Sequence, residues 1–234
     1  MTVLLVRHGR STSNTAHTLA GRAEGVDLDE RGREQAGALV DRIGSLPIRA
    51  IVRSPMLRCE RTVEPLAAAL GLEPVVDDRI SEVDYGAWTG RKIGELVKEP
   101  LWAVVQQQPS AAVFPEGEGL AGVQARAVAA VREHDRRLAD EHSGDVLWVA
   151  CTHGDVIKAV LADALGTHLD SFQRINADPA SVSVIRYTAL RPFVIHVNHT
   201  GPALNSGLSV TPTDEKPQDG DPPTGDAVVG GSTG

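Results

Sequence analysis

Four short apolar runs, separated by longer stretches with helical periodicity, constrain the fold of this chain more than any other feature. The first run is continuously apolar, which is typical of a strand buried on both faces of a parallel sheet. Strands that alternate with helices form a mainly parallel sheet covered on both sides. The sequence therefore predicts an α/β fold, a three-layer α/β/α sandwich. The runs are TVLLVRH (2–8), AIVRS (50–54), EPVVD (73–77) and DVLWVAC (145–151).

Helical spacing of apolar residues fills the gaps between these strands. Asp29 is a suitable N-cap for the first helix. Residues 181–187 and 192–198 are expected to form a closing pair of strands joined by a short turn. Residues 86–118 are poorly patterned, and we expect a lid or a small helical insertion there. Further helices are predicted from Pro55 to about Leu70, from Leu120 to about Glu141, and through Ile157 to Leu165.

The last 32 residues differ in composition from residues 1–202, which we take as one domain. Residues 203–234 contain four prolines, six glycines and no aromatic residue, and five acidic side chains face one lysine. Such a segment cannot bury enough apolar surface to offset the entropy lost on ordering. We predict that it is a disordered, acidic tail.

Composition argues against several classes of function. The chain has 234 residues and a formal net charge of −8, whereas nucleic-acid binders are usually basic. No apolar stretch approaches the roughly 20 residues of a membrane helix, and Met1 leads directly into a strand-like segment. Cys59 and Cys151 suggest neither a disulfide framework nor a zinc site. We expect a cytoplasmic protein without nucleic-acid or membrane partners, and a homo-oligomer stays open.

Charged and polar residues follow the predicted strands at the edge of the sheet where α/β proteins bind ligands. Arg7 and His8 end the first strand, Ser54 follows the second with Arg58 one helical turn further on, and His153 follows the fourth. Arginine matches phosphate oxygens with its planar fork, and a neutral imidazole is a competent nucleophile. Together these residues predict a phosphoryl-transfer site, although each alone also fits an ordinary strand end or surface ion pair.

Four segments, in this order along the chain, resemble the motifs of the histidine phosphatase superfamily, the phosphoglycerate mutase-like proteins. The first carries its Arg-His-Gly signature, and the last carries its second His-Gly element. Met56 stands where the family's second motif usually has leucine. The resemblance extends to about Asn198 and implies the phosphoglycerate mutase-like fold. The segments are LVRHGRSTSN (5–14), SPMLRCERT (54–62), EVDYGAWTG (82–90) and CTHGDVI (151–157).

The resemblance also implies a role for each matching residue. His8 would be the phosphorylated nucleophile, and Glu82 would donate a proton to the leaving group and later act as the base for water. No metal and no cofactor are implied, and the substrate would be a small phosphorylated metabolite. The residues implied to bind the phosphate are Arg7, Arg58, His153 and Asn14.

Three of these readings keep an alternative. Asp84 lies two residues from Glu82, on the same side of an extended segment, and competes with it as the proton donor. Asn14 is also a suitable turn residue. Arg22 fits either the border of the phosphate entrance or a solvated loop.

The same motifs serve phosphatases and phosphomutases, and we favour a phosphatase. No lysine or arginine occurs between Glu99 and Ala125, whereas the resemblance implies basic residues there in glycolytic mutases. PEGEG (115–119) resembles the Pro-x-Gly-Glu-Ser element of the phosphatase branch, with glycine replacing serine. Arg91 and Lys92 are the counter-argument, because they could hold a second anion. An inactive module that binds phosphorylated partners is the alternative from another class.

A pH dependence follows from these roles. The nucleophile His8 must be neutral to attack, and Glu82 must be protonated to donate. Neighbouring arginines lower the pKa of a histidine. We therefore expect a mildly acidic optimum.

Overall fold

The first apolar run forms β1 (Thr2–Arg7), which lies inside the sheet between β4 and β5. Its side chains alternate between two cores: Val3 and Leu5 pack on one face of the sheet, and Leu4 and Val6 pack on the other. All four are fully buried. Because both faces of this strand are covered, apolar side chains are favoured at every position and do not alternate with polar ones.

The structure is a computed structural model and describes residues 1–142, 145–202 and 204. In this part of the chain, six strands form one sheet in the order β3-β2-β4-β1-β5-β6. The first four strands along the chain run parallel, and β5 and β6 add an antiparallel edge. Their bounds are β2 (Ile48–Arg53), β3 (Val75–Val76), β4 (Leu147–Thr152), β5 (Val182–Tyr187) and β6 (Pro192–His199).

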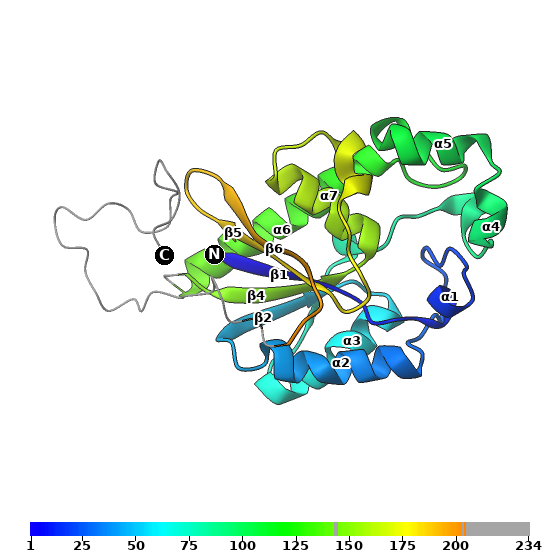
Figure 1. Cartoon of the computed structure of the whole chain (residues 1–234). Coiled ribbons are helices and arrows are strands. Elements are labelled where there is room, and N and C mark those ends of the chain that lie inside the picture. The colour runs from blue at the N-terminus through cyan, green and yellow to red at the C-terminus, as the bar shows by residue number, and fades with distance from the viewer. Residues whose placement is uncertain (143–144, 203, 205–234) are drawn as a thin grey trace.

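Helices cover both faces of this sheet, as Figure 1 shows, so the predicted three-layer α/β/α architecture is confirmed. The core on one side contains residues of α6 and α7, and the core on the other contains residues of α2 and α3. The helix bounds are α2 (Glu30–Ile43), α3 (Leu57–Leu70), α6 (Leu120–His142) and α7 (Gly154–Ala164).

Local signals place the helix ends close to the predicted positions. The Asp29 side chain accepts a hydrogen bond from the Gly32 amide at 2.8 Å and caps α2, as predicted. Gly71 ends α3 in the left-handed conformation. α3 begins at Leu57 rather than at Pro55, because Met56 still has extended backbone.

The poorly patterned stretch 86–118 is built from short helical pieces. It contains α4 (Ile93–Leu96), α5 (Pro100–Gln107) and two single 3₁₀ turns. Trp88 stacks on Trp102 with ring centroids 6.2 Å apart, which joins two parts of the insertion. Trp88, Val105 and Phe114 are buried in the same core as residues of α6 and α7, so the insertion packs onto the body of the domain. α1 (Thr12–Thr15) is a single turn that faces this insertion in Figure 1.

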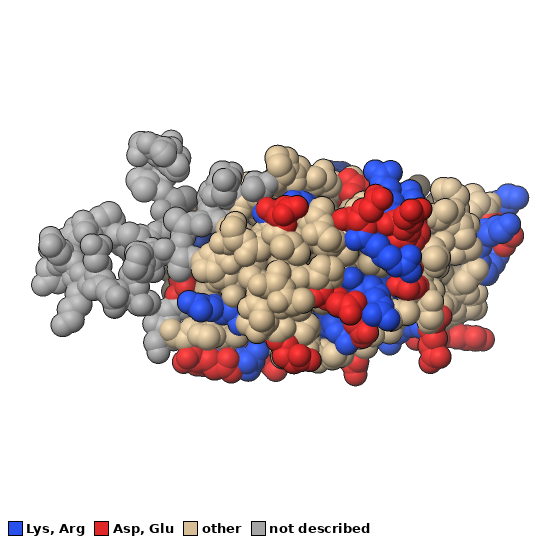
Figure 2. Space-filling view, turned by 90° about the horizontal axis from the view of Figure 1, so that it is seen from below, with Lys and Arg blue, Asp and Glu red and all other residues tan. Residues whose placement is uncertain are grey.

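The predicted tail lies outside the described residues except for its second residue, Leu204. Leu204 is 2% exposed and packs in the α2–α3 core, and its amide donates to the Arg42 carbonyl. The α2–α3 side of the molecule carries acidic and basic side chains interspersed with each other (Figure 2). Among the helices of the described part, none combines the length and the apolar character that crossing a membrane requires.

Candidate active site

A cavity of about 270 Å³ opens at the edge of the sheet where the parallel strands end. Five of the seven predicted site residues line it, from β1, α1, α3 and the segment after β3. His153 and Arg22 are not among the lining residues. The predicted residues that line the cavity are Arg7, His8, Asn14, Arg58 and Glu82.

His8 is held in one tautomer by the backbone. Its Nδ1 lies 2.7 Å from the Gly9 carbonyl, and because a carbonyl can only accept, Nδ1 must carry the proton. In the neutral ring Nε2 then keeps its lone pair. Burial, and then the charges of Arg58 and Arg7, hold the pKa of His8 well below its usual value. The imidazole is therefore neutral, as a nucleophile must be.

Two glycines allow the loop after His8 to lie against the start of α2. A Cβ on Gly32 would lie 2.0 Å from the Arg10 carbonyl, and one on Gly9 would lie 2.7 Å from the Gly32 carbonyl. Thr62 of α3 fixes the same loop, because its Oγ1 accepts from the Gly9 amide at 2.9 Å and donates to the Arg58 carbonyl at 2.6 Å. The close approach of the two backbones thus explains the glycine after His8, and the hydrogen bonds of Thr62 explain the threonine of the second motif.

The two arginines offer donors with no partner in the described part of the protein. Arg58 is 1% exposed, and its Nε and Nη1 are buried without a hydrogen bond. Arg7 donates from Nη1 to the Ala177 carbonyl at 2.6 Å, while its Nε is buried and unpartnered. A buried unsatisfied donor costs about 1–3 kcal/mol, and more when it is charged. A phosphoryl group would satisfy these donors bidentately.

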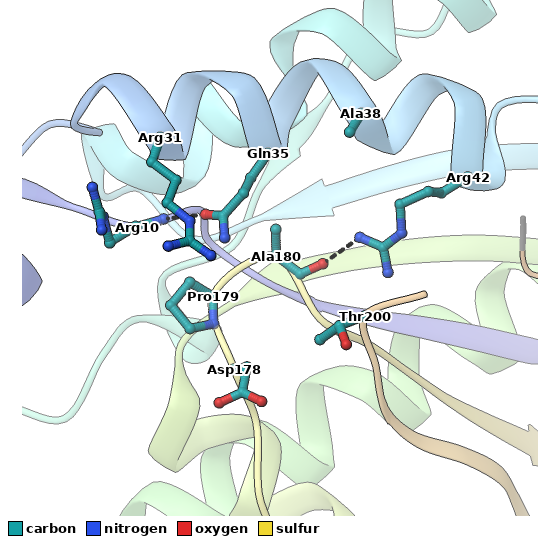
Figure 3. A pocket seen from close by; sticks show the side chains of 9 residues that line it. All are labelled: Arg10, Arg31, Gln35, Ala38, Arg42, Asp178, Pro179, Ala180 and Thr200. Atoms are coloured by element: carbon teal, nitrogen blue, oxygen red, sulfur yellow. Dashed lines mark hydrogen bonds between the residues drawn. The ribbon is translucent and has the colours of Figure 1, made fainter. Parts of the chain in front are cut away.

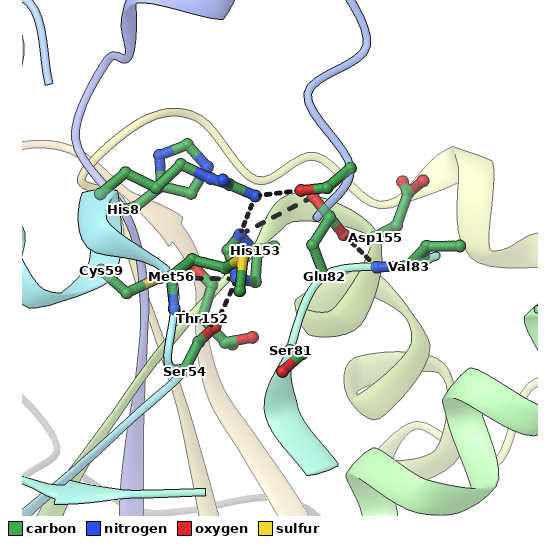
Figure 4. Close-up of polar contacts among 12 residues, drawn as sticks. His8, Ser54, Met56, Cys59, Ser81, Glu82, Val83, Thr152, His153 and Asp155 are labelled. Carbon is green, nitrogen blue, oxygen red and sulfur yellow. Dashed lines mark hydrogen bonds and ion pairs between the residues drawn. The ribbon is translucent and has the colours of Figure 1, made fainter. Parts of the chain in front are cut away.

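His153 is fully buried, and Figure 4 shows its polar contacts with Ser54 and Glu82. Arg58 donates from Nη2 to His153 Nδ1 at 3.1 Å and to the Gly21 carbonyl at 2.8 Å, and the Ser54 hydroxyl lies 2.8 Å from His153 Nε2. Burial and the nearby arginine charges keep the pKa of His153 well below its usual value. The positive charge of the cavity wall therefore comes from the arginines, and His153 orients one of them.

Glu82 has the proton affinity that a general acid needs. Its Oε1 accepts from the Val83 amide at 2.9 Å, and its Oε2 lies 3.8 Å from His153 Nδ1. Burial and the negative charge of Asp155 raise the pKa of Glu82 to about 7, against the opposing effect of Arg58. Glu82 can therefore donate a proton below neutral pH and accept one after it has donated.

The contacts of Asp84 and Asn14 bear on the alternatives that the sequence left open. Asp84 is not among the cavity-lining residues, and its carboxylate accepts from the Gly86 amide at 3.0 Å in a turn. Asn14 is both a lining residue and a capping residue, because its Oδ1 accepts from the Ser11 amide at 3.0 Å. Its amide group keeps its donors for the cavity.

Arg22 lies outside the cavity and holds the backbone behind it. Its Nε donates to the Glu82 carbonyl at 2.9 Å, and it pairs with Glu118 at 2.9 Å. Arg126 donates to the same carbonyl at 3.2 Å and pairs with the same carboxylate. The Glu118 amide in turn donates to the Asp84 carbonyl. Glu118, the second glutamate of the PEGEG segment, thus helps to fix the backbone position of Glu82.

The comparisons with known proteins agree with this geometry. The family model described as "Histidine phosphatase superfamily (branch 1)" matches residues 3–200. The chain belongs to this superfamily. It is 31% identical over 206 residues to phosphoserine phosphatase 1 of Hydrogenobacter thermophilus, covering 85% of this chain and 92% of that protein.

A protein named as a mutase is also among the relatives, and the fold is shared with solved structures. The chain is 29% identical over 184 residues to a probable phosphoglycerate mutase GpmB of Erwinia tasmaniensis, which covers 77% of this chain and 82% of that protein. The solved structure of mycobacterial hydrolase 1 superposes with a TM-score of 0.77 at 23% identity, covering 86% of this chain and 99% of that chain. The superfamily and its fold, both expected from the four motifs, are confirmed.

The sequence predicted no role at this histidine phosphatase site for Tyr85, Asp155 or Lys158, although the first two lie within the motif segments. Asp155 lies in the first turn of α7, whose N-cap is His153. The Asp155 carboxylate accepts from the Tyr85 hydroxyl at 2.8 Å and from Lys158 at 3.2 Å, and both partners line the cavity. Spacing on α7 placed Lys158 one turn from Asp155, which is the one signal that the sequence offered.

Proposed function

We propose that this protein is a metal-independent phosphomonoesterase that hydrolyses small phosphorylated metabolites through a phosphohistidine on His8. One observation carries the proposal: the neutral His8 keeps its Nε2 lone pair beside buried, unpartnered guanidinium donors of Arg7 and Arg58. A nucleophile next to positive donors is the arrangement that phosphoryl transfer requires. The Hydrogenobacter relative, named a phosphoserine phosphatase, supports a small phosphomonoester as substrate.

In the first step, His8 Nε2 attacks phosphorus in line with the ester oxygen. Arg7 and Arg58 hold the equatorial oxygens, where negative charge develops. Protonated Glu82 transfers its proton to the departing ester oxygen, so that the alcohol leaves neutral. The N–P bond forms as the P–O bond breaks.

In the second step, the Glu82 carboxylate accepts a proton from water as the water attacks phosphohistidine. The N–P bond breaks, inorganic phosphate leaves, and both His8 and protonated Glu82 are regenerated. The guanidinium groups stabilise charge in both steps, and the proposal assigns no step to a metal.

Intact-protein mass spectrometry during turnover of p-nitrophenyl phosphate tests the proposal, with a chelator present. We expect phosphate release and an acid-labile adduct of about 80 Da, the mass of one phosphoryl group, that is absent from His8→Ala. Release without an adduct would contradict the covalent route, and loss of activity on chelation would contradict metal independence. Tight phosphate binding with neither release nor adduct would support the inactive binding module instead.

A phosphomutase is the second candidate, because GpmB-type proteins are among the relatives. A mutase must hold a second anionic group of its substrate. Arg91 pairs with Glu99 at 2.8 Å, and neither Arg91 nor Lys92 is among the residues that line the cavity. Only a phosphohistidine that persists in water, and is discharged by a phosphoglycerate acceptor, would favour the mutase.

Location and partners stay proposals as well. Cys59 and Cys151 are both buried and unpaired, which supports a reducing compartment such as the cytoplasm. Cell fractionation tests that assignment. The homo-oligomer and the absence of a nucleic-acid partner stay predictions, which light scattering and a filter-binding assay address directly.

A further inference from the structure

A second and larger cavity lies on the other side of the chain segment that borders the active site. Its volume is about 570 Å³, and it lies between one face of α2 and residues 178–180 (Figure 3). Its lining from α2 comes from positions three or four apart, which share one face of a helix. The lining residues of α2 are Arg31, Gln35, Ala38 and Arg42.

The lining of this cavity is basic in a chain that is acidic overall. Arg10, Arg31 and Arg42 face a single carboxylate, that of Asp178. The Asp178 carboxylate already accepts from the Asn198 amide group at 2.8 Å. Three guanidinium charges against this carboxylate and Asp29, which pairs with Arg10, leave one positive charge in excess.

The basic groups differ in how far they are neutralised. Arg42 is half-buried and donates only to carbonyls, those of Gly201, Ala180 and His199, at 2.7–2.9 Å, so its charge is not paired. Arg31 is exposed and makes no hydrogen bond or ion pair in the part of the chain that the structure describes. Only Arg10 has a carboxylate partner, Asp29, at 2.5 Å.

Gln35 adds an uncharged donor between these arginines. Its Oε1 accepts from the Arg10 amide at 2.9 Å, which fixes the orientation of the side-chain amide. The NH₂ group then points into the cavity, as Figure 3 shows. No aromatic side chain lines the cavity, so it offers no surface on which a nucleotide base could stack.

The wall between the two cavities is one short segment. Asn176 and Ala177 line the active site, whereas Asp178, Pro179 and Ala180 line the second cavity. The Ala180 amide donates to the carbonyls of Arg7 and His8, both at 3.1 Å, while the Ala180 carbonyl accepts from Arg42. A ligand that contacts Arg42 therefore acts on backbone bonded directly to the nucleophile.

We propose that this cavity is a second anion site for an elongated, non-aromatic metabolite with an anionic group at each end, at least one of them a phosphate. One end binds Arg10, Arg31 and the Gln35 amide, and the other end lies over Ala38 toward Arg42. Occupancy of the site changes the kinetics at His8 through residues 176–180.

Gln35→Glu is the sharpest variant, because it keeps the oxygen that accepts from the Arg10 amide and replaces only the NH₂ group with a charged oxygen. Arg31→Glu reverses the one unpaired, exposed charge. Arg33→Glu is the matched control: it makes the same charge change on the same helix, but Arg33 pairs with Asp27 and does not line this cavity. All three side chains lie at or near the surface, so the variants should fold. Thermal unfolding checks this.

The binding probe is hexane-1,6-diyl bisphosphonate, whose P–C bonds a phosphomonoesterase does not cleave, and the assay is isothermal titration calorimetry of the full chain. We expect Gln35→Glu and Arg31→Glu each to weaken or remove one class of binding at least tenfold, while Arg33→Glu matches the wild type. Arg58→Ala should remove the other class, that of the active site. Titrations of the wild type and Gln35→Glu that coincide would overturn the second site.

Kinetics with p-nitrophenyl phosphate test the coupling between the cavities. The probe should inhibit the wild type with a mixed pattern, in which kcat changes at least twofold. Gln35→Glu should show purely competitive inhibition, since only its active site is still occupied. Purely competitive inhibition of both proteins would overturn the coupling.

Discussion

Two charged clusters lie at opposite ends of the segment from Asp77 to Glu82, and they treat buried charge in opposite ways. At one end, the Asp77 carboxylate accepts from Arg79 at 2.7 Å and from His134 at 2.8 Å, and Arg79 also pairs with Glu133. At the other end, the Glu82 side chain is 12% exposed and lies beside arginine donors that have no partner in the described part of the protein. The first cluster is satisfied, and the second is held ready for a substrate.

The pKa values record this difference. Burial alone would raise the pKa of Asp77, but the hydrogen bonds from Arg79 and His134 lower it to about 2. Burial and Asp155 raise the pKa of Glu82 to about 7. Asp77 therefore stabilises the fold above its unfolded-state pKa and loses that contribution as pH falls through about 2, whereas ionising Glu82 destabilises the fold as pH rises from about 4.5 to 7.

Glu82→Gln is expected to have the largest effect, because it removes the proton donor and keeps the shape. Activity on an alkyl phosphate should fall by about 10²–10⁴-fold. p-Nitrophenol leaves without help, so p-nitrophenyl phosphate should still give a burst and a phosphohistidine that accumulates for want of a base. Rapid-quench kinetics with both substrates check this.

Stability provides the control for Glu82→Gln. At pH 8 the variant should unfold with a free energy about 3 kcal/mol higher than the wild type, since the wild type must ionise a buried carboxyl. The difference should vanish near pH 4. A variant that is less stable at pH 8 would show that Glu82 is a structural residue.

Asp77→Asn tests the other cluster and should have the reverse outcome. The substitution should lower the free energy of unfolding by about 2 kcal/mol at pH 7, because it removes the anion that Arg79 and His134 share and leaves Arg79 paired with Glu133 alone. Activity should stay within about twofold of the wild type, since no atom of Asp77 lines the cavity. Urea denaturation and a turnover assay together decide it. A loss of activity at unchanged stability would break the comparison.

The pH profile of the wild type measures the catalytic cluster without any substitution. Because Glu82 must be protonated, kcat/KM should fall about tenfold per pH unit above pH 7. The acidic limb should lie well below pH 6.5, because burial and the arginines lower the pKa of His8. The substrate ionises in the same range, so the Glu82→Gln profile serves as the baseline. An optimum above pH 9 would contradict these roles.

The sequence predicted which strand ends meet at the site better than it predicted the side-chain contacts there. β1, β2 and β4 are continuous enough to be read as strands, and parallel strands must bring their carboxyl ends to one edge, so Arg7, His8 and Arg58 were predicted together. The insertion was not predicted in detail, because 3₁₀ turns and a single-turn helix carry too few residues for a periodic pattern.

Contacts between distant segments account for the rest. Glu118 reaches Arg22 and Arg126, and Arg22 therefore lies behind Glu82 instead of beside the phosphate entrance. Nothing in local spacing indicates a contact between residues almost a hundred positions apart. The proton affinity of Glu82 is similar, because it depends on burial and on Asp155, which only the fold brings near.

Asp155→Asn should have the smallest effect and gives the finest test of the comparison. The substitution removes the negative charge that raises the pKa of Glu82 and releases the charge of Lys158, which Asp155 now pairs. The alkaline limb of the pH profile should therefore move down by about half a unit to one unit. Asparagine can still accept a hydrogen bond from the Tyr85 hydroxyl. At about pH 5.5, below the alkaline limb of both proteins, kcat should therefore hardly change.

Lys158→Gln reverses the sign and completes this test. Without the ammonium, the Asp155 charge acts unopposed on Glu82, and the alkaline limb should move up. Opposite shifts in the two variants, with thermal unfolding unchanged, would show that the pair sets the proton affinity of the general acid. Shifts in the same direction would mean that the pair acts through the shape of the cavity. The difference in pKa between Asp77 and Glu82 would then be explained by burial of Glu82 without a contribution from the charge of Asp155.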